Sequence, residues 1–336
     1  LICSCTSDTE TEGKTSQEVH SDKFEELWID TIGYVTDEPL WLPENAYDAA
    51  ASLMVPMHYA YKFPQRFSDD PRPKFAKLAQ DSYLYTDFDT FEGNVVKYQY
   101  LYFLSQYLKL SHQQGMLDID IFNWVKNEVL RSWDTVNAFH WDSNLNLIGV
   151  RGRLKWLLSE PETQYKFYKA VIDMDWFTLA ALNDVIYIAN DLDLNIDVDT
   201  QEVFKLTEEV INHFGSRDGA YWFFQRGIWA DHRDYAYAGW GEVVAGLERK
   251  PVENIGIDSN HLHRLPLWLK SFADANPQKY DFFYNIIELH RVTYESLVLT
   301  DSTDAYGNPI LLQNNFSTGE NGVYRYGYVT QGQNNG

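Results

Sequence analysis

Helical segments of two kinds alternate along the chain, and this alternation constrains the fold more than any other feature of the sequence. In the segment 91–110 apolar side chains point nearly all round the predicted helix, whereas in 120–133 they fall on one stripe. The first set comprises Phe91, Val95, Val96, Tyr98, Leu101, Tyr102, Leu104 and Leu108, and the second comprises Ile121, Phe122, Val125, Val129 and Trp133. A helix that is apolar on every face must be covered on all sides, while a one-sided helix lies at the surface.

The same pair of segments recurs further along the chain. The segment 165–188 is apolar on every face, and 200–214 carries a single stripe. That stripe is formed by Val203, Leu206, Val210 and Ile211. A third pair is predicted at 261–275 and 278–297. Asp120 and Asp199 each open a one-sided helix, and we expect both to be N-caps because a short carboxylate accepts from the first free backbone N–H groups.

The alternation predicts an all-α fold with an inner and an outer layer of helices. We expect residues 23–336 to form a single α/α toroid, that is, an incomplete or complete ring of helical hairpins with aromatic-rich loops. In a four-helix bundle, all helices would instead be expected to carry the same one-sided apolar pattern. Strand signals are few, and the best of them, 322–329, predicts a hairpin or an extended loop. This architecture resembles the six-hairpin glycosidase and polysaccharide-lyase superfamily over roughly residues 40–300, a resemblance that implies activity on glycans.

The two cysteines of the chain lie together at its N-terminus. Residues Ile2-Cys3-Ser4-Cys5 resemble the lipobox of bacterial lipoproteins, with an apolar residue at position −3 and a small one at −1. The resemblance implies lipid on Cys5 and a place in the bacterial cell envelope, in the periplasm or at the outer-membrane surface. Residues 6–22 have the composition of a flexible tether, so 1–22 is interpreted as signal-peptide remnant, lipobox and tether. The alternative is a chance pair of cysteines in a disordered tail.

Charge and composition exclude several classes of function. The net charge is −22 and no Lys/Arg run is present, so nucleic acid is excluded as a partner and membrane contact is expected through the lipid only. No P-loop, dinucleotide fingerprint, zinc-protease or serine-esterase motif occurs. Aromatic residues make up 16% of the chain. Trp and Tyr suit clefts that are partly exposed to solvent, because each combines an apolar ring with a polar tip. The expected partner is therefore an oligosaccharide or polysaccharide.

The window 225–264 concentrates aromatic, cationic and acidic side chains. Aromatic faces can stack on sugars while polar groups take the hydroxyls, and hydrolysis needs two carboxyl groups that flank the scissile bond. The candidate carboxyl groups are Asp231, Asp234, Glu242 and Asp258, of which Asp231 and Glu242 are the preferred pair. The expected substrate-binding residues are Trp229, His232, Arg233, Asp234, Trp240, His263 and Arg264.

β-Elimination is the second reaction that the same window could support. Asn260-His261 resembles the Asn-His pair of some α/α-toroid lyases, with Tyr237 available to move a proton. The cationic cluster favours elimination on a uronate, whereas the acidic charge of the whole protein opposes an acidic polymer. Hydrolysis and elimination therefore both stay open. The alternatives are a non-catalytic surface protein that binds glycans and a hydrogen-bond network that only holds loops together.

An acidic turn between two predicted helices has the spacing of an EF-hand-like calcium loop. Its candidate ligands are Asp191, Asp193, Asn195, Asp197, Asp199 and Glu202. Ile196 departs from the pattern, because this position of a calcium loop is normally Gly and a β-branched residue disfavours a positive φ. A structural calcium ion is thus a hypothesis beside a solvated acidic turn, and no cofactor is required for the expected chemistry.

Overall fold

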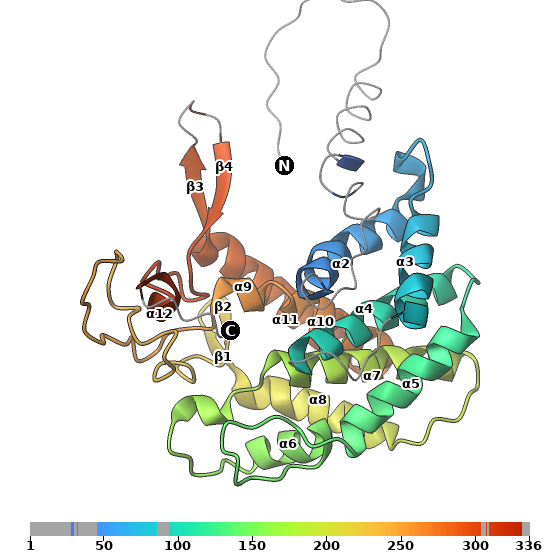
Figure 1. Ribbon diagram of the computed structural model, residues 1–336, viewed down its shortest axis with the longest axis horizontal. Coiled ribbons are helices and arrows are strands. Elements are labelled where there is room, and N and C mark those ends of the chain that lie inside the picture. Colours follow the sequence, from blue (N-terminus) through green and yellow to red (C-terminus); the bar gives the residue numbers. More distant parts are fainter. Residues whose placement is uncertain are drawn as a thin grey trace, which may run out of the picture. The chain divides into compact units, whose positions relative to one another are not determined.

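Helices dominate the part of the chain that the computed structural model describes, which is residues 28–29, 32, 46–85, 94–303, 307 and 309–330 (Figure 1). The chain divides into two units, Leu1–Glu92 and Gly93–Gly336, and each is described by itself. Residues 1–22, with the predicted lipobox and Cys5, lie outside the described residues. Within the described ranges, no helix combines the length and the apolar character needed to cross a membrane.

The first unit contains a pair of helices in contact. These are α2 (Ala46–Lys62) and α3 (Arg72–Tyr85), with the short η3 (Pro64–Arg66) between them. Leu53, Met57 and Ala60 recur at helical spacing on α2 and are buried, as are Phe75 and Ala79 on α3. An apolar stripe on each helix therefore accounts for their packing.

The second unit contains most of the helices. In chain order they are α4 (Asn94–Gln113), α5 (Ile119–Asp134), α6 (Gly149–Leu158), η5 (Lys166–Lys169), α7 (Asp173–Asp191), α8 (Thr200–Phe214), α9 (Ser259–Leu262), α10 (Leu265–Ala275), η6 (Pro277–Lys279), α11 (Tyr280–Thr293), the π-helical η7 (Tyr294–Val298) and α12 (Tyr326–Thr330). Helix α7 contacts α4, α5, α6, α8 and α10, so it lies at the centre of the helical part of this unit. The predominantly helical fold class is confirmed.

The predicted alternation between covered and one-sided helices agrees with the burial of side chains. Helix α7 is buried along nearly its whole length from Asp175 to Ala189, whereas α5 and α8 bury one stripe each. The start of α7 differs from the prediction, because the helix begins at Asp173 and not near residue 165. The side chain of Asp175 accepts from the N–H of Ile172 at 2.9 Å, which fixes the helix start at this point.

One of the two predicted N-caps is correct and the other is shifted by two residues. Asp199 caps α8 by accepting from the N–H groups of Gln201 and Glu202 at 3.0 and 3.2 Å. The cap of α5 is Asp118 and not Asp120, because Asp118 has the extended backbone that a cap requires and Asp120 already lies inside the helix.

In the described part of the second unit, two antiparallel hairpins interrupt the helices. Strand β1 (Gly215–Asp218) follows α8 directly and pairs with β2 (Tyr221–Phe224), and β3 (Leu299–Thr303) pairs with β4 (Pro309–Gln313). The sequence did not predict either hairpin. The segment 322–329, expected as a hairpin or an extended loop, is irregular up to Arg325 and then enters α12. Arg325 has a φ of 53°, which ends the extended run.

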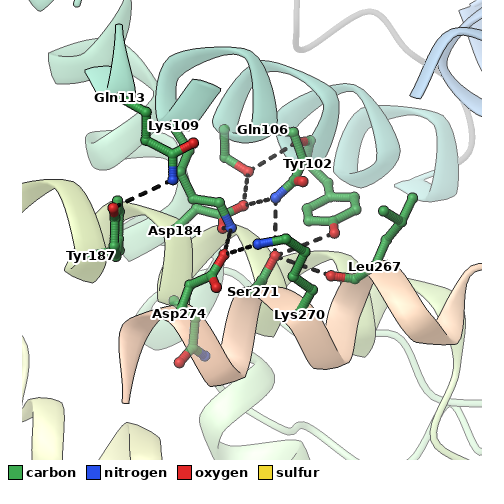
Figure 2. A network of polar contacts seen from close by, with 12 residues as sticks. Tyr102, Gln106, Lys109, Gln113, Asp184, Tyr187, Leu267, Lys270, Ser271 and Asp274 are labelled. Carbon is green, nitrogen blue, oxygen red and sulfur yellow. Dashed lines mark hydrogen bonds and ion pairs between the residues drawn. The ribbon is translucent and has the colours of Figure 1, made fainter. Parts of the chain in front are cut away.

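A buried polar network ties α4, α7 and α10 together (Figure 2). Nζ of Lys109 lies 2.8 Å from a carboxylate oxygen of Asp184 and 2.9 Å from one of Asp274. Gln106 and Ser105 also donate to Asp184, and Lys270 pairs with Asp274 at 2.5 Å. Each helix therefore contributes at least one charge, and the two lysines balance the two aspartates.

Candidate functional site

A cavity of about 240 Å³ lies beside α7, α9 and α10 within the second unit. Its aromatic lining residues are Phe139, Trp141, Trp176, Phe224, Trp229, Tyr235, Trp268 and Tyr324, and its polar ones are Asp173, His232, Asp234, Asp258, His261 and Arg325. Aromatic walls with a few convergent polar groups are the usual composition of a ligand site. The cavity is therefore the candidate functional site of the described chain.

His261 and Asp258 form a hydrogen-bonded pair at this cavity. Asp258 caps α9 by accepting from the N–H of His261, so the side chain of His261 lies one helical turn from the carboxylate. Both oxygens of Asp258 lie 2.8 Å from Nδ1 of His261. A carboxylate only accepts, so Nδ1 must carry the proton and Nε2 is left as the ring nitrogen that can take up another.

Tyr235 holds the carboxylate of Asp258 from the other side. The Tyr235 hydroxyl donates to Oδ2 of Asp258 at 2.7 Å and accepts from the backbone N–H of Asp258 at 3.1 Å. Burial opposes ionisation of Asp258, but the hydrogen bonds from His261 and Tyr235 and the nearby positive charges together outweigh it, so the pKa of Asp258 lies below its ordinary value. Burial also raises the pKa of Tyr235 well above its ordinary value. Asp258 therefore stays ionised and Tyr235 stays protonated.

A second carboxylate faces the other ring nitrogen of His261. Oδ2 of Asp173, the first residue of α7, lies 3.9 Å from Nε2 and 2.5 Å from Nη1 of Arg264. Burial acts to lower the pKa of His261, but the hydrogen bond to Asp258 and the charge of Asp173 outweigh it, so the pKa lies above its ordinary value. His261 thus has the environment of a group that exchanges protons.

Asp234 and Arg325 form the second charged pair of the cavity. Nε of Arg325 lies 3.4 Å from Oδ2 of Asp234, and its guanidinium lies over the rings of Tyr324 and Tyr328 at 5.2 and 5.3 Å. The backbone of Arg325 is left-handed, a conformation that costs a non-glycine residue free energy and that is common at functional sites.

The segment 315–325 is held against the window 225–264 by backbone contacts. Ser317 donates to the carbonyl of Ile257 at 2.9 Å, and Arg325 donates to that of Asp234 at 3.0 Å. Gly322 permits this approach, because a Cβ atom there would lie 1.7 Å from the carbonyl oxygen of Ala238. The two segments together therefore position Tyr324 and Arg325 at the cavity.

Two groups of aromatic rings in mutual contact form the aromatic wall of the cavity. Trp229 stacks on Tyr235 with ring centroids 5.8 Å apart, and Trp229 also meets the edge of Trp141 at 5.9 Å. Trp176 and Trp268 stack at 5.5 Å on the side of α7 and α10. Trp141 and Trp229 are only partly buried, and their faces suit the C–H surface of a sugar ring, whereas Tyr235, Trp176 and Trp268 are buried.

Five of the residues singled out in the sequence line this cavity. They are Trp229, His232, Asp234, Asp258 and His261. Arg264 does not line it, but it contacts the lining residue Asp173. Burial lowers the pKa of His232, so this histidine is neutral at pH 7 and can act as a hydrogen-bond donor or acceptor.

The other residues singled out in the window do not line the cavity. Asp231 accepts from the backbone N–H groups of Lys166 and Phe167, Asn260 accepts from Gln313, and the ring of Tyr237 packs on Tyr326. Glu242, Arg233 and His263 are exposed, and Trp240 is exposed with Lys250 over its ring. The catalytic roles expected for Asp231 and Glu242 stay predictions.

Several lining residues were not foreseen from the sequence. Tyr235 lies inside the window, and Tyr324 and Arg325 lie in the segment that was noted only as a strand signal. Trp141 belongs to the aromatic run 139–141, which gives a local signal but no indication of its partner. Asp173 has no such signal, because its contact with His261 joins residues far apart in the chain.

Three of the six predicted calcium ligands are engaged by other groups. Asp191 lies 2.7 Å from Nε2 of His112, Asp199 caps α8, and Glu202 pairs with Arg151 and Lys155. Among the described residues, which include this whole turn, no group of three or more His, Cys, Asp or Glu is placed to hold a metal ion. The calcium site stays a prediction.

Comparison of the chain with protein-family models, with curated proteins and with solved structures found no match.

Proposed function

We propose that the second unit binds a glycan in the cavity and cleaves it by acid–base chemistry, with His261 as the group that takes up the proton. The observation that carries the proposal is the pair of His261 and Asp258 beside an aromatic wall. Asp258 fixes the proton on Nδ1 and stabilises the imidazolium that forms when Nε2 accepts another. The aromatic wall supplies the surface on which a sugar ring stacks.

β-Elimination on a uronate is the reaction that these groups favour. Nε2 of His261 removes the proton from the carbon next to the uronate carboxylate, the electron pair forms a carbon–carbon double bond, and the glycosidic C–O bond breaks. Water protonates the departing oxygen. Arg325 supports this reaction because a guanidinium can neutralise the uronate carboxylate. Hydrolysis by two carboxyl groups needs one that stays protonated, and the lowered pKa of Asp258 makes it unsuitable for that role.

We further propose that the alternating helices of the second unit are hairpins of an α/α toroid, complete or incomplete. The burial of α7 on every face, with α5 and α8 buried on one face only, supports this arrangement. The resemblance of Ile2-Cys3-Ser4-Cys5 to a lipobox supports a lipid-anchored place in the bacterial cell envelope. A protein there would meet extracellular or cell-wall glycans.

The test is incubation of the purified protein with a panel of neutral and uronate-containing polysaccharides. Reducing ends and the ultraviolet absorbance of an unsaturated uronate are followed together. Both signals are expected, and both should be lost in His261→Gln but kept in Glu248→Gln, which changes an exposed loop residue outside the cavity. Reducing ends without the absorbance would favour hydrolysis and direct mutation to Asp231 and Glu242. Retention on a glycan gel without either signal would favour the binding protein.

A further inference from the structure

A second cavity of about 360 Å³ adjoins the first one. Trp141 lines both cavities, and it is the residue that they share. The second cavity lies between the loop 140–145 and the segment 162–164, with Trp156 and Tyr168 in its wall. It belongs to the same unit as the candidate site.

The lining of the second cavity is suited to an uncharged, hydroxyl-rich ligand. Three aromatic side chains, Trp141, Trp156 and Tyr168, stand beside hydrogen-bonding groups that include Asn144 and Gln164. No Lys or Arg is among its lining residues, and its carboxylates would repel a second uronate. A neutral sugar ring meets all of these conditions.

The shared residue Trp141 is held firmly in place. Its ring is nearly parallel to that of Tyr168, with centroids 6.1 Å apart, and the guanidinium of Arg153 lies 6.0 Å from its centroid. Arg153 is fully buried and is itself fixed by Asp175 at 2.9 Å and by the carbonyl of Ala170 at 2.6 Å. A ligand that passes from one cavity to the other would therefore meet a preorganised aromatic surface.

We propose that the second cavity binds a neutral sugar ring of the same chain whose uronate occupies the first. This inference rests on the proposed function and names its substrate class, an oligosaccharide or polysaccharide that contains both kinds of ring. Ligand cavities usually measure about 300–1,000 Å³. The first cavity alone lies below that range and the two together lie within it.

The test is the dependence of affinity on chain length. Titration calorimetry would use uronate-containing and purely neutral oligosaccharides, each from the monosaccharide to the hexasaccharide. We expect a uronate linked to neutral sugars to bind at least tenfold more tightly than the free uronate. Trp156→Ala should weaken the binding of the linked chain about tenfold, which corresponds to about 1.4 kcal/mol. The affinity for the free uronate should stay unchanged. Trp156→Phe should restore most of the gain.

Two further variants keep the result interpretable. Gln164→Ala, at an exposed loop position, should also reduce the gain, and Tyr280→Ala should not, because Tyr280 lines neither cavity. Equal affinity for all lengths, or equal weakening of free uronate and oligosaccharide by Trp156→Ala, would overturn this inference alone. If the affinity of oligouronates increased with length as much as that of mixed chains, the proposal that the second cavity binds a neutral sugar ring would be overturned. Absence of any saccharide binding and cleavage would overturn the proposed function, and this inference with it.

Discussion

Nζ of Lys109 on α4 lies 2.8 Å from Oδ1 of Asp184 on α7, and the side chains are only 1% and 0% exposed. Burial acts to lower the pKa of Lys109, but the charges of Asp184 and Asp274 outweigh it, so the pKa lies above its ordinary value. Burial of a charge is costly unless the charge is paired and hydrogen-bonded. The network therefore favours the one arrangement of α4, α7 and α10 that satisfies all of its members (Figure 2).

Lys109→Met should destabilise the second unit by about 3–5 kcal/mol, because it leaves Asp184 buried without its cation. The free energy of unfolding in urea measures the effect. Lys205→Met is the matched control, since Lys205 pairs with Glu209 at 3.7 Å on the exposed face of α8, and it should cost less than about 0.5 kcal/mol. Equal losses in the two variants would contradict a special role for the buried pair.

Asp258→Asn should lower the pKa of His261, because it removes the carboxylate whose hydrogen bond and charge favour the imidazolium. NMR titration of the imidazole carbon-bound protons measures this directly and needs no substrate. The same variant should reduce any cleavage by about 100-fold or more, since the correct tautomer is no longer enforced. An unchanged pKa of His261 would show that the pair does not control this histidine.

Stability should fall as the pH falls from about 6.5 to about 4 because of His290. Burial lowers the pKa of this histidine from 6.5 to about 4, and its side chain lies in the interior at the end of α11. In this window the unfolded chain holds a proton that the folded chain does not, so protons favour unfolding. The expected loss is about 3 kcal/mol over the window and none above it.

The measurement is the free energy of unfolding of wild type and His290→Gln at several pH values. The variant lacks the titrating ring. Its unfolding free energy should therefore fall by about 3 kcal/mol less than that of the wild type between neutral and acidic pH. Parallel pH profiles for the two proteins would refute this role for His290. The absolute stability at pH 7 does not enter the comparison.

Gly322→Ala should disturb the placement of Tyr324 and Arg325. The added Cβ would lie 1.7 Å from the carbonyl oxygen of Ala238, so one backbone segment must move. A loss of about 1–3 kcal/mol in unfolding free energy is expected, together with weaker glycan binding. Gly241→Ala is the control, since a Cβ there meets nothing within 4 Å and should leave both quantities unchanged.

Cys5→Ala should abolish lipid attachment when the chain is expressed in a bacterium with a complete signal peptide ahead of Leu1. The reason is that the thiol of Cys5 is the acceptor that the lipobox resemblance implies. Metabolic labelling with a fatty-acid analogue and mass spectrometry of the N-terminal peptide measure attachment. Cys3→Ala is the control and should stay labelled, whereas labelling that depends on Cys3 would contradict the assignment.

The helical pattern could be derived from the sequence because it depends on neighbours along the chain. The stripe of α8 and its cap Asp199 follow from spacing alone, since residues three and four apart share a face. The start of α7 was misplaced because the apolar run of 165–172 looks helical, whereas the side chain of Asp175 caps the helix at Ile172. Apolar periodicity does not record such a contact.

In the candidate site, too, some contacts could be derived from the sequence and others could not. Composition placed Asp258 and His261 in a functional window because cations and carboxylates cluster there, and their spacing of three residues on a helix start lets them meet. Only the tertiary structure brings Asp173 to Nε2 of His261, places Trp141 against Trp229, and turns Asp231 toward the backbone of Lys166. The sequence by itself determined which segments are helical, because that depends on local periodicity. The tertiary structure decided which side chains converge, because their contacts join residues tens of positions apart and depend on how the helices and loops pack.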